Sequence, residues 1–500
     1  MAIPVSVEII AYLNSLYGED ASKQYLEYIE KDYAVYIRVN TLKTTTEFLR
    51  KKLYDNYKIE TEELDFPKGL LKIKSGFIYV GKTVEHIIGL YYIQSLSSAV
   101  PAMILNPTEN DLVLDLCSAP GSKTTQMAVM MNNRGSLLVN ESQTDRIKSL
   151  IYNVERMNLI NTAVIHNKGE NLSRYFSGYF DKILVDAPCS GLGIMQKRNE
   201  VNNWWTHRRA LRLSDLQIKL LVAAIKMLKV GGEIVYSTCT MTPEENEFVI
   251  DKVLHKYPLE LVKINIPLKT HDGFVQYGGQ HYDSSLKFSK RIIPWEIDSE
   301  GFYIAKLKKI GETESPDLIP IPYASIKLME SSNKLISDKL NYLADHFGID
   351  HNEFDKYLYV QRNEDLYMLN KDFSDQSFSL MRRYGIKLAA FDKDGSLVLQ
   401  TQAAEFLENV ITKNIFQLNS TSGLKTYVEG GTIKTKSDCS GQCVVKFQEY
   451  LLGTAVITDN GIKSRFPRPK RTQEIIKDFR NNQDEHSDYR HQEVQRNTKS

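Results

Sequence analysis

Apolar and polar residues follow two periods in the central part of the chain. Between about residues 90 and 310, short apolar runs typical of buried strands alternate with stretches whose apolar residues recur every three or four positions, the spacing of an amphipathic helix. The predicted strands are Leu112–Asp115, Ser136–Asn140, Thr162–His166, Lys182–Asp186, Glu233–Ser237 and Phe302–Leu307, and the predicted helices include Lys123–Met131, Arg146–Met157 and Leu213–Leu228. This alternation predicts an α/β core built on an open parallel sheet.

The pattern changes on both sides of this core. The first 90 residues mix helical stretches with short predicted strands at Ala34–Val39 and Phe77–Val80, an α+β pattern. Gly231 and Gly232 are expected to end the last core helix as a C-cap. The pattern divides the chain into residues 1–90, 91–310, a linking domain at 311–380, a β-rich module at 381–470 and a polar tail at 471–500 that we expect to be disordered.

Composition and charge narrow the functional classes. The 500 residues contain 63 Lys and Arg against 62 Asp and Glu, a net charge of +1, which excludes a uniformly basic nucleic-acid coat but not a local basic patch. No run approaches the roughly 18 apolar residues of a membrane span, and the first residues lack the basic start of a secretory signal. Five cysteines, an odd number, argue against a disulfide framework and favour a reducing cytoplasm.

A loop after the first core strand is a candidate cofactor site. Asp115 ends the strand, Cys117–Gly121 form the turn, and Ser122 or Lys123 begins a helix whose unpaired N–H groups can face a ligand. Glu141 follows the next strand and could accept hydrogen bonds from both hydroxyls of a ribose. The pattern predicts an adenosine-type cofactor, although an ordinary strand–helix turn has the same residues. The phosphate-loop pattern is absent, and Gly121 is the loop's only glycine.

Two further predicted strands end beside cysteines. Asp186 is followed by Ala-Pro-Cys189, and Cys239 follows the strand that ends at Ser237. Because ligands of a parallel sheet bind at the carboxyl ends of its strands, these residues are expected to face one crevice. A buried cysteine is often only a small apolar side chain. Zinc is not expected, because 50 residues separate the two cysteines and no histidine pair is near.

These residue types fit methylation of a pyrimidine at carbon 5. Carbon 5 is a poor nucleophile until a thiolate adds to carbon 6, after which the ring can accept a methyl group from a sulfonium. One cysteine must attack, and a second group must remove the carbon 5 proton so that the adduct can eliminate. Asp186 could hydrogen-bond or protonate cytosine N3, or it could merely cap the turn that follows its strand.

Three segments resemble signature motifs of the Sun/Nop family of RNA cytosine-5 methyltransferases, which use S-adenosyl-L-methionine. They are DLCSAPGSKT, DAPCSG and YSTCTMTPEEN, and the resemblance extends to RVNTLK, GLYYIQSLSS and GFYIAKL, covering about residues 30 to 310. It implies a Rossmann-like methyltransferase core in which Cys239 is the nucleophile, Cys189 assists product release and Asp186 contacts cofactor and base.

The resemblance also implies a cofactor-binding set and shows one departure. The implied set is Cys117, Ser118, Ala119, Pro120, Gly121, Ser122, Lys123, Glu141 and Asp186. The family usually has an acidic residue after the third strand, near the adenine amino group. Here that segment reads VIHNKGENL, and Asn167 or Glu170 could substitute.

The two ends of the chain imply RNA binding. The C-terminal part resembles the extension of the bacterial small-subunit rRNA methyltransferase F branch, a linking domain followed by a PUA-like module, and the N-terminal α+β region is expected to bind RNA as well. The run Lys463–Arg471 carries five cations and no carboxylate, so it either contacts phosphates or is a solvated basic end. Cys439 and Cys443 are interpreted as structural and metal-free.

The leading hypothesis is therefore an RNA cytosine-5 methyltransferase that acts on rRNA, with tRNA as the alternative substrate. A non-catalytic RNA-binding protein on the same fold is disfavoured because both cysteines are kept. In a DNA cytosine-5 methyltransferase the Pro-Cys cysteine, Cys189, would attack instead. We expect a monomer without a metal or membrane partner.

Overall fold

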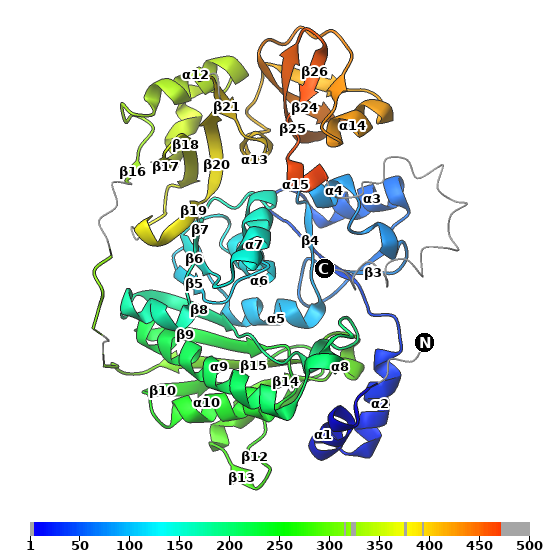
Figure 1. Cartoon of the computed structure of the whole chain (residues 1–500), viewed down its shortest axis with the longest axis vertical. Helices are drawn as coiled ribbons and strands as arrows, with labels where there is room; N and C mark the ends of the chain where they lie inside the picture. The colour runs from blue at the N-terminus through cyan, green and yellow to red at the C-terminus, as the bar shows by residue number, and fades with distance from the viewer. Residues whose placement is uncertain (1–4, 315–316, 322–326, 375–377, 393–394, 472–500) are drawn as a thin grey trace.

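The computed structural model describes residues 5–314, 317–321, 327–374, 378–392 and 395–471, so the tail predicted to be disordered lies almost wholly outside the described residues. The centre is a ten-stranded sheet of order β11-β14-β15-β9-β8-β5-β6-β7-β19, with β10 paired to β15 (Figure 1). Its strands are β5 (Leu112–Asp115), β6 (Ser136–Asn140), β7 (Thr162–Ile165), β8 (Phe180–Asp186), β9 (Leu228–Thr238), β10 (Leu259–Val262), β11 (His271–Asp272), β14 (Lys290–Ile292), β15 (Phe302–Lys309) and β19 (Met381–Tyr384). All six predicted strands are present, which confirms the α/β core.

Helices cover both faces of this sheet. The main ones are α5 (Leu96–Leu105), α6 (Ser122–Met130), α7 (Thr144–Arg156), α9 (His207–Met227) and α10 (Glu247–Leu254). Side chains of β5 alternate between two cores: Val113 packs with α5, α6 and α7, whereas Leu114 packs with α9 and α10. A strand buried on both faces is continuously apolar, which is why the pattern of short apolar runs located these strands.

The strand order creates a crevice at the carboxyl end of β5. Strand β5 pairs in parallel with β6 on one side and with β8 on the other. The chain therefore leaves β5 toward one side of the sheet and returns through β8 on the other, a topological switch point where ligands bind in open α/β sheets. The loops after β5 and β8 meet there.

Two local predictions are wrong. Phe77–Val80 is not a strand: Phe77–Tyr79 forms a 3-10 turn, η1, because Gly76 before it adopts a φ of 76° and turns the chain, leaving Phe77 and Ile78 exposed. Gly231 and Gly232 do not cap α9, which ends at Met227. They lie inside β9 where its register with β8 shifts, and a Cβ on Gly232 would lie 2.8 Å from the Asp181 carbonyl oxygen, so the pair permits a bulge.

The N-terminal part consists of two helices and a small sheet. Helices α1 (Val7–Tyr17) and α2 (Glu19–Ile29) share an apolar cluster with the segment after β8, including η3 (Leu192–Ile194) and α8 (Val201–Trp204). The antiparallel sheet has the order β2-β3-β1-β4. Its elements are β1 (Tyr36–Val39), α3 (Thr46–Tyr57), β2 (Thr61–Glu63), β3 (Leu70–Ile73), α4 (Val84–Ile87) and β4 (Tyr91–Ile93). This part therefore contacts the core beside the crevice.

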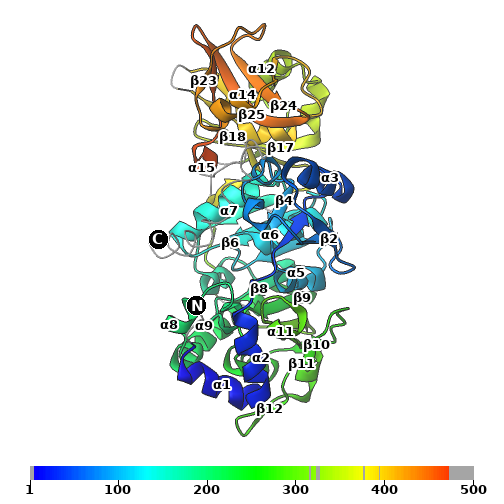
Figure 2. The ribbon, with the colours of Figure 1, turned by 90° about the vertical axis from the view of Figure 1, so that its right-hand side faces the viewer.

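The C-terminal part contains two five-stranded sheets, stacked at one end of an elongated molecule (Figure 2). The first comprises β16 (Leu328–Met329), β17 (Tyr357–Arg362), β18 (Asp365–Asn370), β20 (Ile386–Phe391) and β21 (Leu397–Leu399), with α12 (Ser337–Phe347) and α13 (Thr401–Phe406) beside it. The second comprises β22 (Ile415–Leu418), β23 (Thr432–Ile433), β24 (Gln442–Phe447), β25 (Tyr450–Thr458) and β26 (Gly461–Ser464), with α14 (Thr421–Val428) and α15 (Arg468–Arg471). The predicted boundary between the linking domain and the β-rich module, at residue 380, therefore falls within the first sheet, between its strands β18 and β20.

A buried ionic junction joins three parts of the chain. Glu405 on α13 accepts a hydrogen bond from Lys470 on α15 at 3.1 Å, and the Nζ of Lys43, just after β1, lies 3.6 Å from its other oxygen. Lys43 also donates to Asn158 of the core at 2.6 Å. Burial lowers the pKa of Lys43 to about 8. The N-terminal part, the core and the C-terminal part thus share one set of polar contacts.

Within the described residues, no helix is long and apolar enough to cross a membrane.

Candidate active site

The loop after β5 is anchored to the neighbouring strand. Both the N–H and the hydroxyl of Ser118 donate to the carbonyl of Asn140, at 2.9 and 2.6 Å. Gly121 precedes the first residue of α6 with a φ of 105°, and a Cβ there would lie 3.2 Å from Leu150, so glycine suits both the turn and the close approach of α7. The predicted turn and helix start are therefore present, with α6 beginning at Ser122.

Lys123 and Asp186 form an ion pair between this loop and the end of β8. The Nζ of Lys123 lies 2.7 Å from one Asp186 oxygen, and the Ser237 hydroxyl donates to the other at 2.7 Å. Burial alone would lower the pKa of Lys123, but Asp186 outweighs it and the pKa is raised. Lys123 is therefore a buried cation, and Asp186 is held in one orientation at the ends of three adjacent strands.

A cavity of about 200 Å³ opens over the loop. It is lined by Tyr92, Ile93, Gln94, Ser95, Ser98, Asp115, Cys117, Ser118, Ala119, Pro120, Ser122, Lys123, Asp186, Lys197 and Glu300. In Asp115, one oxygen accepts from Thr124 at 2.6 Å, and the buried Oδ1 has no partner with hydrogen-bonding geometry among the described residues. Burial raises the pKa of Asp115 to about 7. The cavity thus holds a carboxylate without a cation of its own.

The two predicted cysteines lie against each other. The Sγ atoms of Cys189 and Cys239 are 3.1 Å apart, although 50 residues separate them in the chain. The hydrogen bond with Cys239, reinforced by burial, raises the pKa of the Cys189 thiol well above its usual value. Cys189 is therefore held as a thiol beside Cys239.

Glu245 and Gly193 fix the two cysteine loops relative to each other. The buried Glu245 carboxylate accepts from the Ser190 N–H at 2.8 Å and from the Thr242 hydroxyl at 2.7 Å, one residue from each loop. The N–H of Gly193 donates to the Cys239 carbonyl at 3.0 Å, and a Cβ on Gly193 would lie 2.8 Å from that oxygen. Only glycine allows this approach, which sets the separation of the two thiols.

Glu141 lies directly after β6, as predicted, but the cavity's lining among the described residues does not include it. Its Oε1 accepts from the Gln143 N–H at 2.8 Å, and its Oε2 lies 3.5 Å from Arg146, which also donates to the Ala119 carbonyl. Arg146 therefore connects Glu141 to the loop. Asn167 and Glu170 lie after β7, and nothing in the geometry chooses between them for the adenine contact.

Comparisons with known proteins identify the family to which the chain belongs. A family profile described as 16S rRNA methyltransferase RsmB/F matches residues 102–308. The ribosomal RNA small subunit methyltransferase F of Shewanella piezotolerans is 30% identical over 483 residues, which cover 91% of this chain and 94% of that protein. The chain belongs to the RsmB/F family.

Other similar proteins match a smaller share of this chain. The tRNA (cytosine(49)-C(5))-methyltransferase of Pyrococcus abyssi is 38% identical over 291 residues, 58% of this chain and 93% of that protein. A methyltransferase homologue from Pyrococcus horikoshii has a solved structure with a TM-score of 0.53 and 29% identity, covering 61% of this chain and all of that one. These matches confirm the Rossmann-like methyltransferase fold.

S-adenosylmethionine is the methyl donor that the RsmB/F family implies, and the residues present fit it. The unpartnered Oδ1 of Asp115 can pair with the donor's ammonium group, and the free N–H groups at the start of α6 can face its carboxylate. No phosphate site is needed. The cavity therefore has the charges that a sulfonium amino acid requires.

Several supporting residues were missed at the level of sequence. Arg38, in the RVNTLK segment, donates to the Ser122 carbonyl at 2.9 Å and to the Thr125 hydroxyl at 2.7 Å, so it holds the first turn of α6. Its burial lowers the pKa of this guanidinium to about 9. Glu245 lies in the PEEN segment. Both segments were noted as motifs, but the contacts that give them a role cross between distant parts of the chain.

The basic run at the C-terminal end needs a correction. Lys470 cannot contact phosphates, because its side chain is 1% exposed and pairs with Glu405. Arg465 pairs with Asp392, whereas Lys463 and Arg468 are exposed. Only part of the run is therefore available to RNA. Cys439 and Cys443 are free thiols, and among the described residues no cluster of three metal-ligating side chains is present.

Proposed function

We propose that this protein is an S-adenosylmethionine-dependent RNA cytosine-5 methyltransferase that acts on rRNA. The observation that carries the proposal is the pair of thiols 3.1 Å apart beside the cofactor loop. Asp186 and Ser237, which hydrogen-bond each other, each lie two or three residues before one of these cysteines. The thiols and the cavity therefore share one crevice.

Cys239 is the proposed nucleophile, and Cys189 its partner. The hydrogen bond with Cys239 and burial raise the pKa of Cys189 and keep that thiol protonated, which suits it to the partner role. The thiolate adds to carbon 6 of cytosine, and carbon 5 then takes the methyl group, which bound S-adenosylmethionine supplies. Water then takes the carbon 5 proton as general base, and the electron pair of that C–H bond re-forms the C5–C6 double bond and expels Cys239 as a thiolate. Cys189 is proposed to assist this elimination and product release.

Asp186 is proposed to bond the polar edge of the base. Lys123 donates a hydrogen bond to one oxygen of Asp186 and Ser237 donates to the other, so the carboxylate cannot rotate away. Each carboxylate oxygen can accept more than one hydrogen bond, so Asp186 can still accept from the amino group of the cytosine, and from N3 once that atom is protonated as negative charge develops during attack.

The rRNA assignment is supported by the C-terminal part of the chain. The small subunit methyltransferase F relative aligns with 91% of this chain, whereas the tRNA methyltransferase relative aligns with 58%. We propose that residues 1–90 and the C-terminal β-rich part bind RNA, the latter in a PUA-like manner through its second five-stranded sheet, while the first sheet, which contains strands from both sides of residue 380, links it to the core. Bisulfite sequencing of RNA from cells lacking the protein tests the substrate: a lost methylcytosine in tRNA alone would contradict the rRNA assignment.

The two cysteines provide the test of the mechanism. Cys239→Ala should abolish activity and form no covalent complex with RNA. Cys189→Ala should still attack and methylate but release product slowly, leaving a denaturant-resistant protein–RNA complex on a gel. A trapped complex with Cys239→Ala and none with Cys189→Ala would reverse the assignment and restore the DNA-type mechanism. Full activity of both variants would exclude thiol catalysis.

A further inference from the structure

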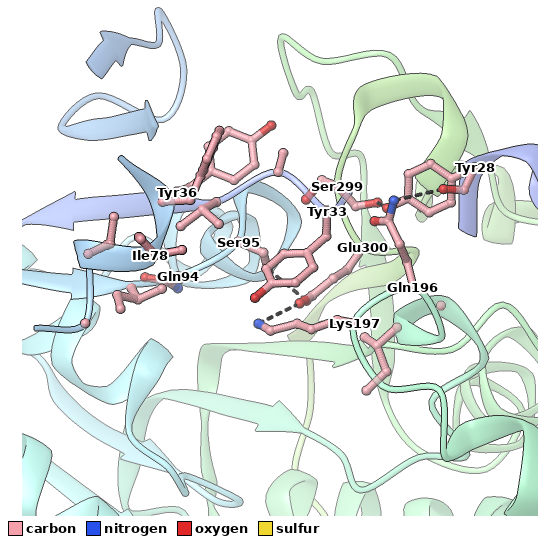
Figure 3. Close-up of a pocket in the computed structure, with 18 of the residues that line it drawn as sticks. Tyr28, Tyr33, Tyr36, Ile78, Gln94, Ser95, Gln196, Lys197, Ser299 and Glu300 are labelled. Atoms are coloured by element: carbon pink, nitrogen blue, oxygen red, sulfur yellow. Dashed lines mark hydrogen bonds and ion pairs between the residues drawn. The ribbon is translucent and has the colours of Figure 1, made fainter. Parts of the chain in front are cut away.

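A second cavity, of about 360 Å³, shares lining residues with the cavity over the loop after β5. Figure 3 shows the side chains that line this second cavity. Its walls come from the segment between α2 and β1, the turn η1 (Phe77–Tyr79), the loop after η3 and residues 299–300 before β15. Five residues line both cavities: Ile93, Gln94, Ser95, Lys197 and Glu300. The two cavities therefore adjoin each other. The volume of the second cavity is within the range of ligand sites.

Large apolar side chains, two of them aromatic, are exposed at this second cavity. Tyr33 is 50% exposed, Phe77 49% and Ile78 46%, and all three line it. The ring of Tyr33 lies beside Ser95, Lys197 and Glu300 in Figure 3. Phe77 and Ile78 are exposed because Gly76 turns the chain into η1 instead of a strand that would bury them. Exposed aromatic and aliphatic faces around a concave site are typical of a surface that is covered when a ligand binds.

A charged pair sits where the two cavities meet. Glu300 accepts from the Ser95 hydroxyl at 2.8 Å and lies 3.2 Å from the Nζ of Lys197. Lys197 is about half exposed, so its remaining donors are available to a ligand, and the carboxylate offers acceptors. A nucleobase combines a flat face with donors and acceptors along its edge, which matches stacking side chains next to this pair.

We propose that the second cavity takes the nucleobase that neighbours the target cytosine in the substrate RNA. This inference rests on the proposed function. A cytosine that enters the crevice must leave its stack, so the adjoining base loses one stacking partner. Proteins that hold single-stranded RNA replace such stacking with aromatic side chains, and here Tyr33 and Phe77 are next to the site of chemistry. Tyr33 and Phe77 are thus positioning residues.

Truncation of these rings tests the inference. The probe is total RNA from cells that lack the protein, with methyl transfer followed from tritiated S-adenosylmethionine. Tyr33→Ala and Phe77→Ala should each raise the KM for RNA by roughly 5- to 150-fold, as for a lost base–aromatic stack. Affinity for S-adenosylmethionine should stay the same, and Tyr33→Phe, which keeps the ring, should behave as the unaltered protein does.

Tyr342→Ala is the matched control. The exposed fraction of Tyr342, 47%, is similar to that of Tyr33, but Tyr342 is on α12 and lines neither cavity. If Tyr33→Ala and Phe77→Ala matched this control in KM while the unaltered protein methylated RNA, the cavity would hold no base and the proposed function would stand. If the unaltered protein transferred no methyl group to any RNA, the proposed function would fail, and this inference with it.

Discussion

Asp115 should make binding of S-adenosylmethionine depend on pH. Its buried Oδ1 has no partner among the described residues, and burial raises its pKa to about 7. The donor's ammonium group pairs only with the ionised carboxylate, so protonation of Asp115 competes with binding. With a pKa near 7, about nine-tenths of the carboxyl is ionised at pH 8 and about one-tenth at pH 6, so the protonation of Asp115 by itself should lower the affinity about tenfold between them.

Calorimetric titration at several pH values measures this dependence. Asp115→Asn should weaken binding at pH 8 by roughly 1.5–3 kcal/mol, as for a lost hydrogen bond to a charged group. The same substitution should also remove the contribution of Asp115 to the pH dependence of S-adenosylmethionine affinity. The donor's own amino group titrates near pH 8 as well, but equally for both proteins, so the difference between the two profiles isolates Asp115.

Unfolding of the cofactor-free protein provides an independent readout. Because the folded-state pKa of Asp115 is raised, the folded state binds more protons than the unfolded state between about pH 4 and 7, so this residue's stabilising contribution is lost as the pH rises to 7. Asp115→Asn should remove that decline. The control is Asp111→Asn at the opposite end of β5, where the carboxylate pairs with Lys182. Identical binding profiles for Asp115→Asn and the unaltered protein would refute the reasoning.

Three further perturbations test other parts of the site. Glu141→Ala should weaken S-adenosylmethionine binding by roughly 1–3 kcal/mol, and calorimetry showing unchanged affinity in the folded variant would remove Glu141 from the cofactor site. Gly193→Ala should reduce kcat about 100-fold through displacement of the Cys239 loop, with cofactor affinity unchanged; normal kcat would contradict the close approach. Lys470→Ala should lower the free energy of unfolding by about 3 kcal/mol, because it leaves the buried Glu405 with Lys43 as its remaining cation. Lys463→Ala should change the free energy of unfolding by less than about 0.5 kcal/mol and should reduce the salt dependence of RNA binding. Equal effects of the two variants on stability would contradict the buried pair.

The parts of the fold that depend on local pattern were predictable. The apolar strands of the core, the turn before α6 and the motif positions of Cys189 and Cys239 all follow from short stretches of sequence. The failures involve partners far away in the chain. Gly231 resembles a helix cap until its register with β8 is known, and Phe77–Val80 resembles a strand until the turn at Gly76 is seen.

In the candidate site, too, features set by local sequence were predictable and features set by distant partners were not. The turn after β5 and the two strand-end cysteines were located from sequence, but the unpartnered oxygen of Asp115 is a property of packing and cannot be read from residue type. Glu245 likewise acquires its role only because two loops converge on it. The basic run was misjudged at Lys470 for a similar reason, since the carboxylate that neutralises it lies 65 positions earlier in the chain.

The buried ionic junction around Glu405 helps to hold the C-terminal part at a fixed position relative to the core. Lys43, Asn158 and Lys470 converge there from the N-terminal part, the core and the last described helix. A second connection is β19, which joins the C-terminal part to the central sheet through β7. If the C-terminal sheets bind RNA as proposed, these two connections hold the bound RNA at a fixed distance from the thiols. Ending the chain before residue 470 would remove Lys470 from the junction and should loosen one of the two connections.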